Sequence, residues 1–297
     1  MYKTSNLYII TKENHDMILT ITNAHMRYRG LNDDETFKLI KEAGFDGVDY
    51  SFFTKETLND EWRALETDDC LNTAKEIKRL LDKHGLVCTQ AHAPFNFSYG
   101  EDMSLSCRNY LDLVNSIKMA AYIGASAIVV HAIKIPADVD FFEYHYKFYK
   151  SLEPFAKECG IKIAVENLVN SIFWAPNRLS GFIRLLDSDV FCACIDVGHA
   201  QLTGYAPNRF INGMDAGILK CLHIQDTDAK VDRHWIPMFG NNDWSAIIKA
   251  LRDYGYDGDM NLEVIHSYDN LPDELLLPCL KYTASVGRYL IKRFKEL

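Results

Sequence analysis

The sequence predicts an α/β protein folded as a single (β/α)8 barrel, the TIM barrel, over residues 1–297. Eight short apolar segments alternate with helical segments, and most helical segments end at a glycine just before the next apolar segment. Eight strands that alternate with helices pair in parallel through right-handed crossovers, which is typical of a barrel at this chain length. A doubly wound open sheet is the alternative, but the GxGxxG turn expected after its first strand is absent. No linker divides the chain, so we expect one domain.

The predicted strands and helices can be placed along the chain from these patterns. The strands are expected at residues 17–23, 46–50, 86–91, 127–130, 161–165, 191–195, 219–222 and 259–262. The helices are expected at residues 33–43, 68–84, 104–123, 141–159, 177–186, 208–216 and 244–254, and a long helix follows the last strand. Asn32 is a favoured helix-capping residue, and Gly44 is placed to end the same helix. We expect the backbone to break at Gly198, after the sixth strand.

Composition and charge narrow the class of protein. Hydrophobic residues make up 48% and charged residues 25% of the chain, as in ordinary globular domains. The net charge of −9 disfavours a surface that coats nucleic acid. No apolar run reaches the roughly 20 residues that span a bilayer, and residues 1–16 lack the apolar core of a secretory leader. The eight cysteines include no CxxC pair, so we expect reduced thiols, a cytoplasmic location and no membrane partner.

Ionisable residues follow the last six predicted strands. In strand order they are His92, His131, Glu166, Asp196, His223 and Glu263. In a barrel of this kind the active site lies at the carboxyl ends of the strands, so these side chains are expected to converge there. Three carboxylates and three imidazoles would repel one another or lose hydration without a cation among them. A divalent metal meets this need, and mixed His and Asp/Glu ligation suits zinc, manganese, cobalt or magnesium. Taken singly, His92 and His131 could also be structural or substrate contacts.

The register of the strands makes a further prediction about the barrel interior. Because side chains alternate along a strand, the residues two positions before each polar end also point inward if Asp196 does. These residues are Gln90, Val129, Ala164, Cys194, Cys221 and Asn261, and Cys192 lies one step lower. Most of them are small or neutral, so we expect a packed interior beneath a polar layer.

Several other residues have two readings. Arg27, Arg29 and Lys134 could hold a substrate phosphate or be solvated loop charges. Phe95, Trp174 and Trp235 could wall a sugar ring or pack within loops. The histidines outside the strand-end pattern are expected at surface or loop positions, and they are His15, His25, His84, His145 and His266.

Eight short motifs, in order along nearly the whole chain, carry a family resemblance. They are GFDGVDY (44–50), HAPF (92–95), IVVHA (128–132), IAVENL (163–168), CIDVGHA (194–200), CLHIQDTD (221–228), DRHWIPMFGNNDW (232–244) and YDGDMNLEV (256–264). Each motif alone is unspecific, but the ordered set resembles the xylose isomerase-like barrel superfamily. That superfamily includes sugar and sugar-phosphate isomerases and epimerases, and the abasic-site endonucleases.

The resemblance implies a metal site and a set of catalytic residues. The family's usual ligands correspond to Glu166, Asp196, His223 and Glu263, and in the sugar enzymes the two glutamates are also the acid–base pair. His199 corresponds to a histidine that contacts substrate. In the abasic-site endonucleases additional ligands hold three zinc ions, and the matching positions here are His92, His131, His199, Asp232 and His234.

These observations lead to a functional hypothesis. The protein is expected to be a divalent-metal-dependent isomerase or epimerase of a sugar or sugar phosphate, with one metal ion per chain and proton transfer through a metal-bound cis-enediolate. The acidic net charge and the loop at 232–244, which looks like a loop of sugar isomerase-like proteins, favour this hypothesis. Asp49, Lys134 and Arg233 are further candidate substrate contacts, and Asp49 stands where many sugar members have a glutamate.

Three alternatives stay open on the same scaffold. The first is an abasic-site endonuclease with up to three zinc ions. The second is a dehydratase of a polyol ketone, and the third is a barrel that binds metal or sugar without catalysis. A homo-oligomer is compatible with each of them.

Overall fold

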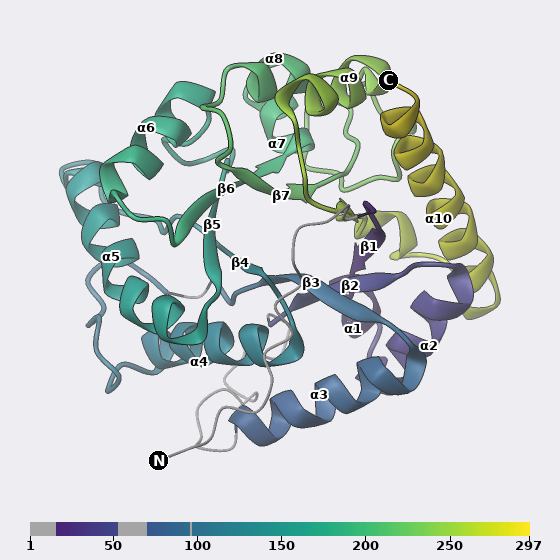
Figure 1. The fold of residues 1–297 in the computed structure, drawn as a ribbon, viewed down its shortest axis with the longest axis horizontal. Helices are drawn as coiled ribbons and strands as arrows, with labels where there is room; N and C mark the ends of the chain where they lie inside the picture. Colours follow the sequence, from purple (N-terminus) through teal and green to yellow (C-terminus); the bar gives the residue numbers. More distant parts are fainter. Residues whose placement is uncertain (1–15, 53–69, 96) are drawn as a thin grey trace.

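The computed structural model describes residues 16–52, 70–95 and 97–297. Within them, eight parallel strands form one sheet in the order β7-β6-β5-β4-β3-β2-β1-β8. The sheet curls round on itself, and the helices surround it (Figure 1). The two outer strands approach at Ile224 and Leu262, where the Ile224 N–H donates to the Asn261 carbonyl at 2.9 Å. The barrel is therefore nearly closed, and the predicted (β/α)8 fold class is confirmed.

The described strands follow the predicted ones closely. They are β1 (Leu19–Thr22), β2 (Gly47–Ser51), β3 (Val87–His92), β4 (Ala127–Val130), β5 (Lys162–Glu166), β6 (Phe191–Asp196), β7 (Leu219–His223) and β8 (Met260–Leu262). The helices are α1 (Ala24–Tyr28), α2 (Asp33–Ala43), α3 (Cys70–His84), α4 (Arg108–Ile123), α5 (Phe141–Cys159), α6 (Pro176–Leu186), α7 (Val197–Leu202), α8 (Pro207–Asn212), α9 (Trp244–Tyr254) and α10 (Asp273–Glu296). A 3-10 turn, η1 (His266–Tyr268), precedes α10.

Local sequence signals set the helix ends, as α2 shows. The Asn32 side chain accepts a hydrogen bond from the Glu35 N–H, and the Glu35 carboxylate accepts one from the Asn32 N–H, each at 3.0 Å. This reciprocal capping box satisfies two N–H groups that the first turn leaves free. Gly44 ends the helix at φ 100°, a left-handed conformation that favours glycine. The chain then enters β2, so the helix stop helps to fix where that strand begins.

The prediction for residues 197–216 is wrong in detail. The backbone does not break at Gly198, because Asp196 caps α7 by accepting the His199 N–H at 2.7 Å. A Cβ at position 198 would lie 2.4 Å from the Gln225 side chain, so a larger residue there would displace that amide. The helix predicted at 208–216 is the shorter α8, and α4 begins four residues later than predicted. The predicted start of α3 at residue 68 lies outside the described residues.

The barrel interior has two levels. The lower level is a separate cluster of small apolar side chains, formed by Ala127, Val129, Ala164, Cys192, Cys194 and Cys221. Four of them precede a polar strand end by two residues, as the predicted register requires. The upper level holds the polar strand ends themselves. A larger apolar core fills the space between the strands and the surrounding helices.

The remaining histidines divide into two groups. His25 and His145, predicted at surface or loop positions, are buried, with 2% and 0% of their surface exposed. The His145 ring accepts the Ile133 N–H at 3.0 Å, and the His25 ring stacks on Tyr268 with centroids 4.5 Å apart. His84 and His266 pair with surface aspartates, and His15 lies outside the described residues.

The structure also describes the state of the cysteines and the character of the helices. All eight cysteines lie in the described residues, and none of them forms a disulfide. No helix in the described part of the chain combines the length and the apolar character that crossing a bilayer requires.

Candidate functional site

The carboxyl ends of the strands surround a cavity of about 840 Å³. Its ionisable lining consists of His92, His131, Lys134, Glu166, His199, Lys230, Asp232, His234 and Glu263, together with Tyr28. Among the described residues, the lining includes Glu166 and Glu263 but not Asp196 or His223, which are fully buried. The structure therefore places most of the predicted site residues around one cavity.

The four side chains Glu166, Asp196, His223 and Glu263 form one compact cluster. Each offers a ligand atom, and these atoms all lie within 4.8 Å of one another. His223 Nδ1 lies between the two glutamates, 3.1 Å from Glu166 Oε1 and 3.3 Å from Glu263 Oε2. On the other side of the ring, His223 Nε2 lies 3.4 Å from Asp49 Oδ2. A carboxylate behind a ligating histidine is a common way to fix its ring and tautomer.

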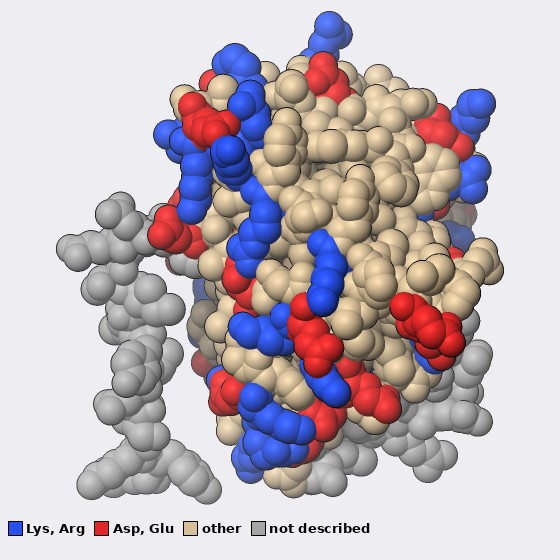
Figure 2. Space-filling model, turned by 90° about the vertical axis from the view of Figure 1, so that its right-hand side faces the viewer, with Lys and Arg blue, Asp and Glu red and all other residues tan. Residues whose placement is uncertain are grey.

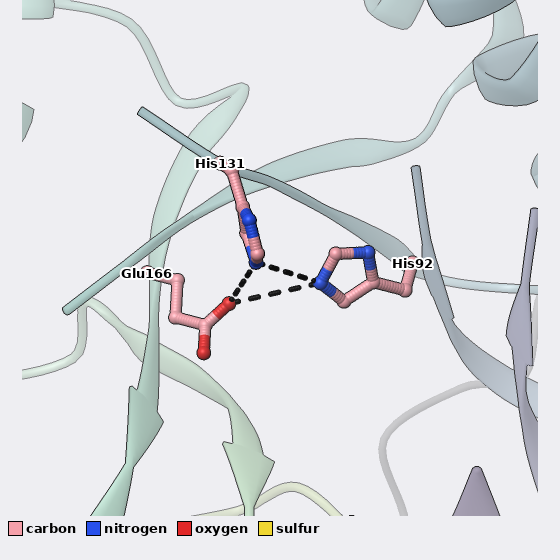
Figure 3. Close-up of side chains that lie close together, drawn as sticks. All are labelled: His92, His131 and Glu166. Carbon is pink, nitrogen blue, oxygen red and sulfur yellow. Dashed lines mark hydrogen bonds and ion pairs between the residues drawn. The ribbon is translucent and has the colours of Figure 1, made fainter. Parts of the chain in front are cut away.

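His92 and His131 meet Glu166 in a second cluster, next to the first (Figure 3). The two Nε2 atoms are 2.9 Å apart, and Glu166 Oε2 lies 2.9 Å from His131 Nε2 and 3.7 Å from His92 Nε2. The side chains come from the ends of β3, β4 and β5 and point at one another. Glu166 is therefore shared between two potential metal positions.

A third cluster shares Asp196 with the first. Asp196, His199 and His234 offer ligand atoms within 4.8 Å of one another. The Oδ2 atom of Asp232 lies 3.1 Å from Nε2 of both His199 and His234. The loop after β7, which contains Asp232 and His234, thus brings the last two predicted ligands to the site.

Hydrogen bonds to backbone carbonyls orient two of the histidine rings towards their clusters. His92 Nδ1 lies 2.8 Å from the Ala93 carbonyl, and His234 Nδ1 lies 3.0 Å from the Glu263 carbonyl. A carbonyl oxygen only accepts, so each Nδ1 carries a hydrogen and each Nε2 is left to face its cluster. This arrangement is typical of histidines that ligate metals. The donor set therefore fits a divalent metal in each of the three clusters.

The pKa values of the two glutamates are shifted in opposite directions. Burial alone would raise the pKa of Glu166, but His223 and His131 hold it well below its usual value. Burial, with repulsion from Glu166 and Asp196, raises the pKa of Glu263 to about 7. Two carboxyl groups with separated pKa values are a recurring feature of acid–base sites.

Two amide side chains support the site, and the sequence reasoning missed both as functional residues. The Gln225 Nε2 group donates to Asp232 Oδ1 at 2.8 Å and to Asp196 Oδ1 at 3.2 Å, so it links two acidic ligands. Asn167 exchanges two hydrogen bonds with the Asp196 backbone, at 2.7 and 2.9 Å. The only feature of the sequence that could have indicated these two residues is their position close to a predicted ligand. Asn167 directly follows Glu166, and Gln225 lies two residues after His223.

Two of the predicted substrate contacts, Asp49 and Arg233, are not among the described residues that line the cavity. Asp49 is buried beneath the site, where Gln90 and Asn261 donate to its Oδ2 at 2.8 and 2.9 Å. Arg233 lies over the Trp235 ring and pairs with Asp228 at 3.2 Å. Both residues therefore support the loop and the strand ends through these contacts.

The structure also gives the contacts of the arginines and aromatic residues for which both a substrate contact and a structural contact were considered. Arg27 donates to the Ser51 carbonyl, and Arg29 donates to the carbonyls of Tyr268 and Leu271, so both arginines hold loops. Phe95 lines the cavity and stacks on His131 with centroids 4.9 Å apart. Trp174 packs near Tyr205 at 5.8 Å.

Two curated relatives resemble parts of this chain. An uncharacterized protein of Sinorhizobium fredii, y4fM, is 31% identical over 163 residues, which are 51% of each chain. An uncharacterized protein of Methanocaldococcus jannaschii, MJ1311, is 25% identical over 185 residues, 58% of this chain and 62% of the relative. The chain thus spans about half of the first relative and somewhat more of the second.

Solved structures share the fold over nearly the whole chain. A D-psicose 3-epimerase from Clostridium cellulolyticum H10, solved with D-tagatose, has a TM-score of 0.73 at 15% identity and covers 93% of this chain and 99% of its own. A 3-keto-D-glucoside 4-epimerase from E. coli has a TM-score of 0.69 at 18% identity, over 92% and 99%. An IolI protein with a bound zinc atom has a TM-score of 0.68 at 17% identity, also over 92% and 99%.

A family model described as the xylose isomerase-like TIM barrel matches residues 37–278. This range contains all six polar strand ends and the loop at 232–244. The chain therefore belongs to the xylose isomerase-like TIM barrel family.

Proposed function

We propose that this protein is a divalent-metal-dependent isomerase or epimerase of a sugar or sugar phosphate. One observation carries the proposal: of the four residues in the central cluster, only the two glutamates line the cavity among the described residues. Asp196 and His223 can act only as buried ligands, whereas Glu166 and Glu263 can also touch a bound substrate. The sugar epimerases that share this fold support the choice of substrate class.

The two glutamates approach the cavity from the ends of β5 and β8, on either side of His223. Without a metal, burial raises the pKa of Glu263, whereas the neighbouring histidines lower the pKa of Glu166, so the two carboxyl groups differ in their affinity for a proton. When bound, a divalent metal would polarise a substrate carbonyl and acidify the adjacent C–H bond. Proton removal by one carboxylate and return by the other on the opposite face gives epimerisation. Removal and return by the same carboxylate between adjacent carbons gives isomerisation.

Lysines at the cavity mouth bear on whether the substrate is phosphorylated. Lys134 and Lys230 both line the cavity, and both side chains are exposed. Ammonium groups bind phosphate oxygens well, so these two lysines would select a sugar phosphate over the free sugar. Replacing both with alanine is expected to raise KM for a phosphorylated substrate more than for its free sugar.

The experiment that tests the proposal is proton exchange in deuterated water. The metal-loaded protein is incubated with a panel of ketoses and their phosphates, and carbon-bound deuterium is measured. We expect incorporation at the exchanged carbon for at least one sugar, and its loss in Glu263→Gln. A panel in which no sugar exchanges any carbon-bound hydrogen would overturn the proposal.

A second candidate function is metal-dependent hydrolysis of a phosphodiester, as in the abasic-site endonucleases. The two additional ligand clusters favour it, because they extend the central cluster through the shared residues Glu166 and Asp196. Multinuclear sites are suited to stabilising both the attacking and the leaving oxygen of a phosphate ester. About three zinc ions per chain together with nicking of abasic duplex DNA would favour this function over the sugar enzyme.

A further inference from the structure

The outer face of α10 carries an exposed apolar stripe. Leu275, Tyr282 and Tyr289 are seven residues apart, and 50%, 48% and 50% of their respective surfaces are exposed. The exposed residues between them on the same line, Pro278 and Ser285, carry no charge. A seven-residue spacing keeps side chains on nearly one line of a helix, with a drift of about 20° per repeat. Exposed apolar side chains that gather on one face of a soluble protein often mark an interaction surface.

The apolar surface continues beyond α10. Phe239, 56% exposed in the loop before α9, packs against Tyr282 with ring centroids 5.9 Å apart. Tyr289 and the exposed Met238 border a groove between α9 and α10, with a volume of about 440 Å³. Figure 2 shows the side of the molecule that carries α10, where a broad area without charged side chains lies beside a column of Lys and Arg. We call the area formed by Leu275, Tyr282, Tyr289, Met238 and Phe239 the α10 surface.

The charges along the α10 surface are polarised from one end to the other. The first turn of α10 carries Asp273 and Glu274. The last two turns carry three basic residues and one acid, Lys292, Arg293, Lys295 and Glu296, so this end keeps a net positive charge. A partner with one uniform sign of charge would match one end and repel the other. An antiparallel copy of the same helix would match both ends, because its acidic turn would lie against the basic turns.

We propose that a second copy of this chain covers the α10 surface, with the two α10 helices antiparallel across a two-fold axis at Tyr282. Leu275 and Tyr289 are equally distant from Tyr282 along the helix, so each would contact the other residue on the second copy. The same operation places Glu274 near Lys292 of the second copy. The contact is self-complementary in both shape and charge, as an isologous interface must be. The apolar line from Leu275 to Tyr289 is about 21 Å long at 1.5 Å per residue.

The first test is the mass of the full chain in solution, measured by light scattering across a dilution series. Wild type is expected at twice the chain mass of 34.0 kDa. Tyr282→Lys would place two like charges on the axis and is expected to raise the dimer dissociation constant at least tenfold. Tyr122→Lys is the matched control, because Tyr122 is 46% exposed on α4, and it should leave the mass unchanged. Circular dichroism confirms that both variants fold.

The second test locates the contact. Tyr282→Cys is expected to give a covalent dimer on mild oxidation, because its two copies meet on the axis, whereas Tyr122→Cys is not. Oxidised wild type, which carries only the native cysteines, measures the background of cross-linking. Glu274→Lys should weaken the dimer about tenfold, and adding Lys292→Glu in the same chain should restore it. A monomeric wild type, or a dimer that neither cross-links through residue 282 nor responds to the charge exchange, overturns the proposal.

Discussion

The two levels of the barrel interior come from the same strands but differ in chemical character, because the lower level is apolar and the upper level is ionisable. The lower level, from Ala127 to Cys221, is a cluster of small apolar side chains with no more than 3% of any residue exposed. The upper level, two residues further along each strand, gathers carboxylates and imidazoles within a few ångströms of one another. Packing in the lower level stabilises the fold. The upper level brings together carboxylates whose burial is unfavourable unless a positive charge lies among them.

Two positions on the same strand can therefore serve different purposes, one in packing and one in the site. Val129 and His131 are two residues apart on β4, as are Ala164 and Glu166 on β5. Substitutions in the lower level should therefore lower the free energy of unfolding without changing turnover. Substitutions in the upper level should mainly lower turnover and metal binding. The first three of the following predictions test this division.

The largest effect is expected from the two glutamates of the upper level. Glu166→Gln and Glu263→Gln should each lower turnover by roughly 10²–10⁴-fold, because each removes an acid–base group. In the metal-free protein, Glu263→Gln should not lower the unfolding temperature, because burial already disfavours the Glu263 carboxylate. Glu166→Gln should lower it, because it removes the ion pairs with His131 and His223. Glu143→Gln, on the exposed face of α5, is the control that should leave turnover unchanged. Full turnover in either site variant would remove the acid–base assignment.

A smaller but still large effect is expected from metal binding. Adding zinc to the chelator-treated protein should raise the free energy of unfolding by about 4 kcal/mol at a thousandfold excess over the dissociation constant. Glu166→Gln should lose most of this gain, because Glu166 belongs to two of the three clusters. Urea unfolding with and without zinc measures both values. Equal stabilisation of wild type and variant would argue against Glu166 as a shared ligand.

A change in the lower level should show the opposite pattern. Val129→Ala removes two buried methyl groups from the barrel interior and should cost about 2 kcal/mol of unfolding free energy. Turnover well below the unfolding temperature should stay within about twofold of wild type. Val87→Ala, at a position 48% exposed, is the matched control and should cost much less. If Val129→Ala instead abolished turnover at full stability, the two levels would not be separable.

A pH-dependent effect concerns a buried histidine that lies outside both levels. Burial, with Arg29 nearby, lowers the pKa of His25 to about 3 from the usual 6.5. The unfolded chain therefore takes up a proton below pH 6.5 that the folded chain refuses, so stability falls as the pH drops towards 3. The slope contributed by His25 is about 1.4 kcal/mol per pH unit. His25→Phe, which keeps a ring against Tyr268, should show a shallower decline in urea unfolding between pH 6 and 4; parallel curves would contradict the assignment.

The sequence predicted those features that depend on short-range pattern. Strand ends came within two residues of their observed positions, because glycine stops and apolar runs are local signals. The two interior levels followed from the alternation of side chains once Asp196 was placed inward. The grouping of the strand-end residues into a ligand set rested on the family resemblance as well.

The features that the sequence did not predict depend on tertiary contacts. Asp196 both joins the ligand cluster and caps α7, so the chain turns directly into a helix where a break at Gly198 was expected. Gln225 acquires its role only when the loop after β7 folds back and brings Asp232 to it. The burial of His25 and His145 depends in part on rings distant in sequence, Tyr268 for His25 and Phe173 for His145.

The most direct test of the account is the amount of divalent metal that the protein retains. Wild type and Glu166→Gln are loaded with zinc, dialysed and measured by elemental analysis. The account predicts at least one ion per wild-type chain and a clear loss in Glu166→Gln, while Glu143→Gln retains as much as wild type. Wild-type protein that retains no ion after dialysis would contradict the claim that these strand ends form a metal centre.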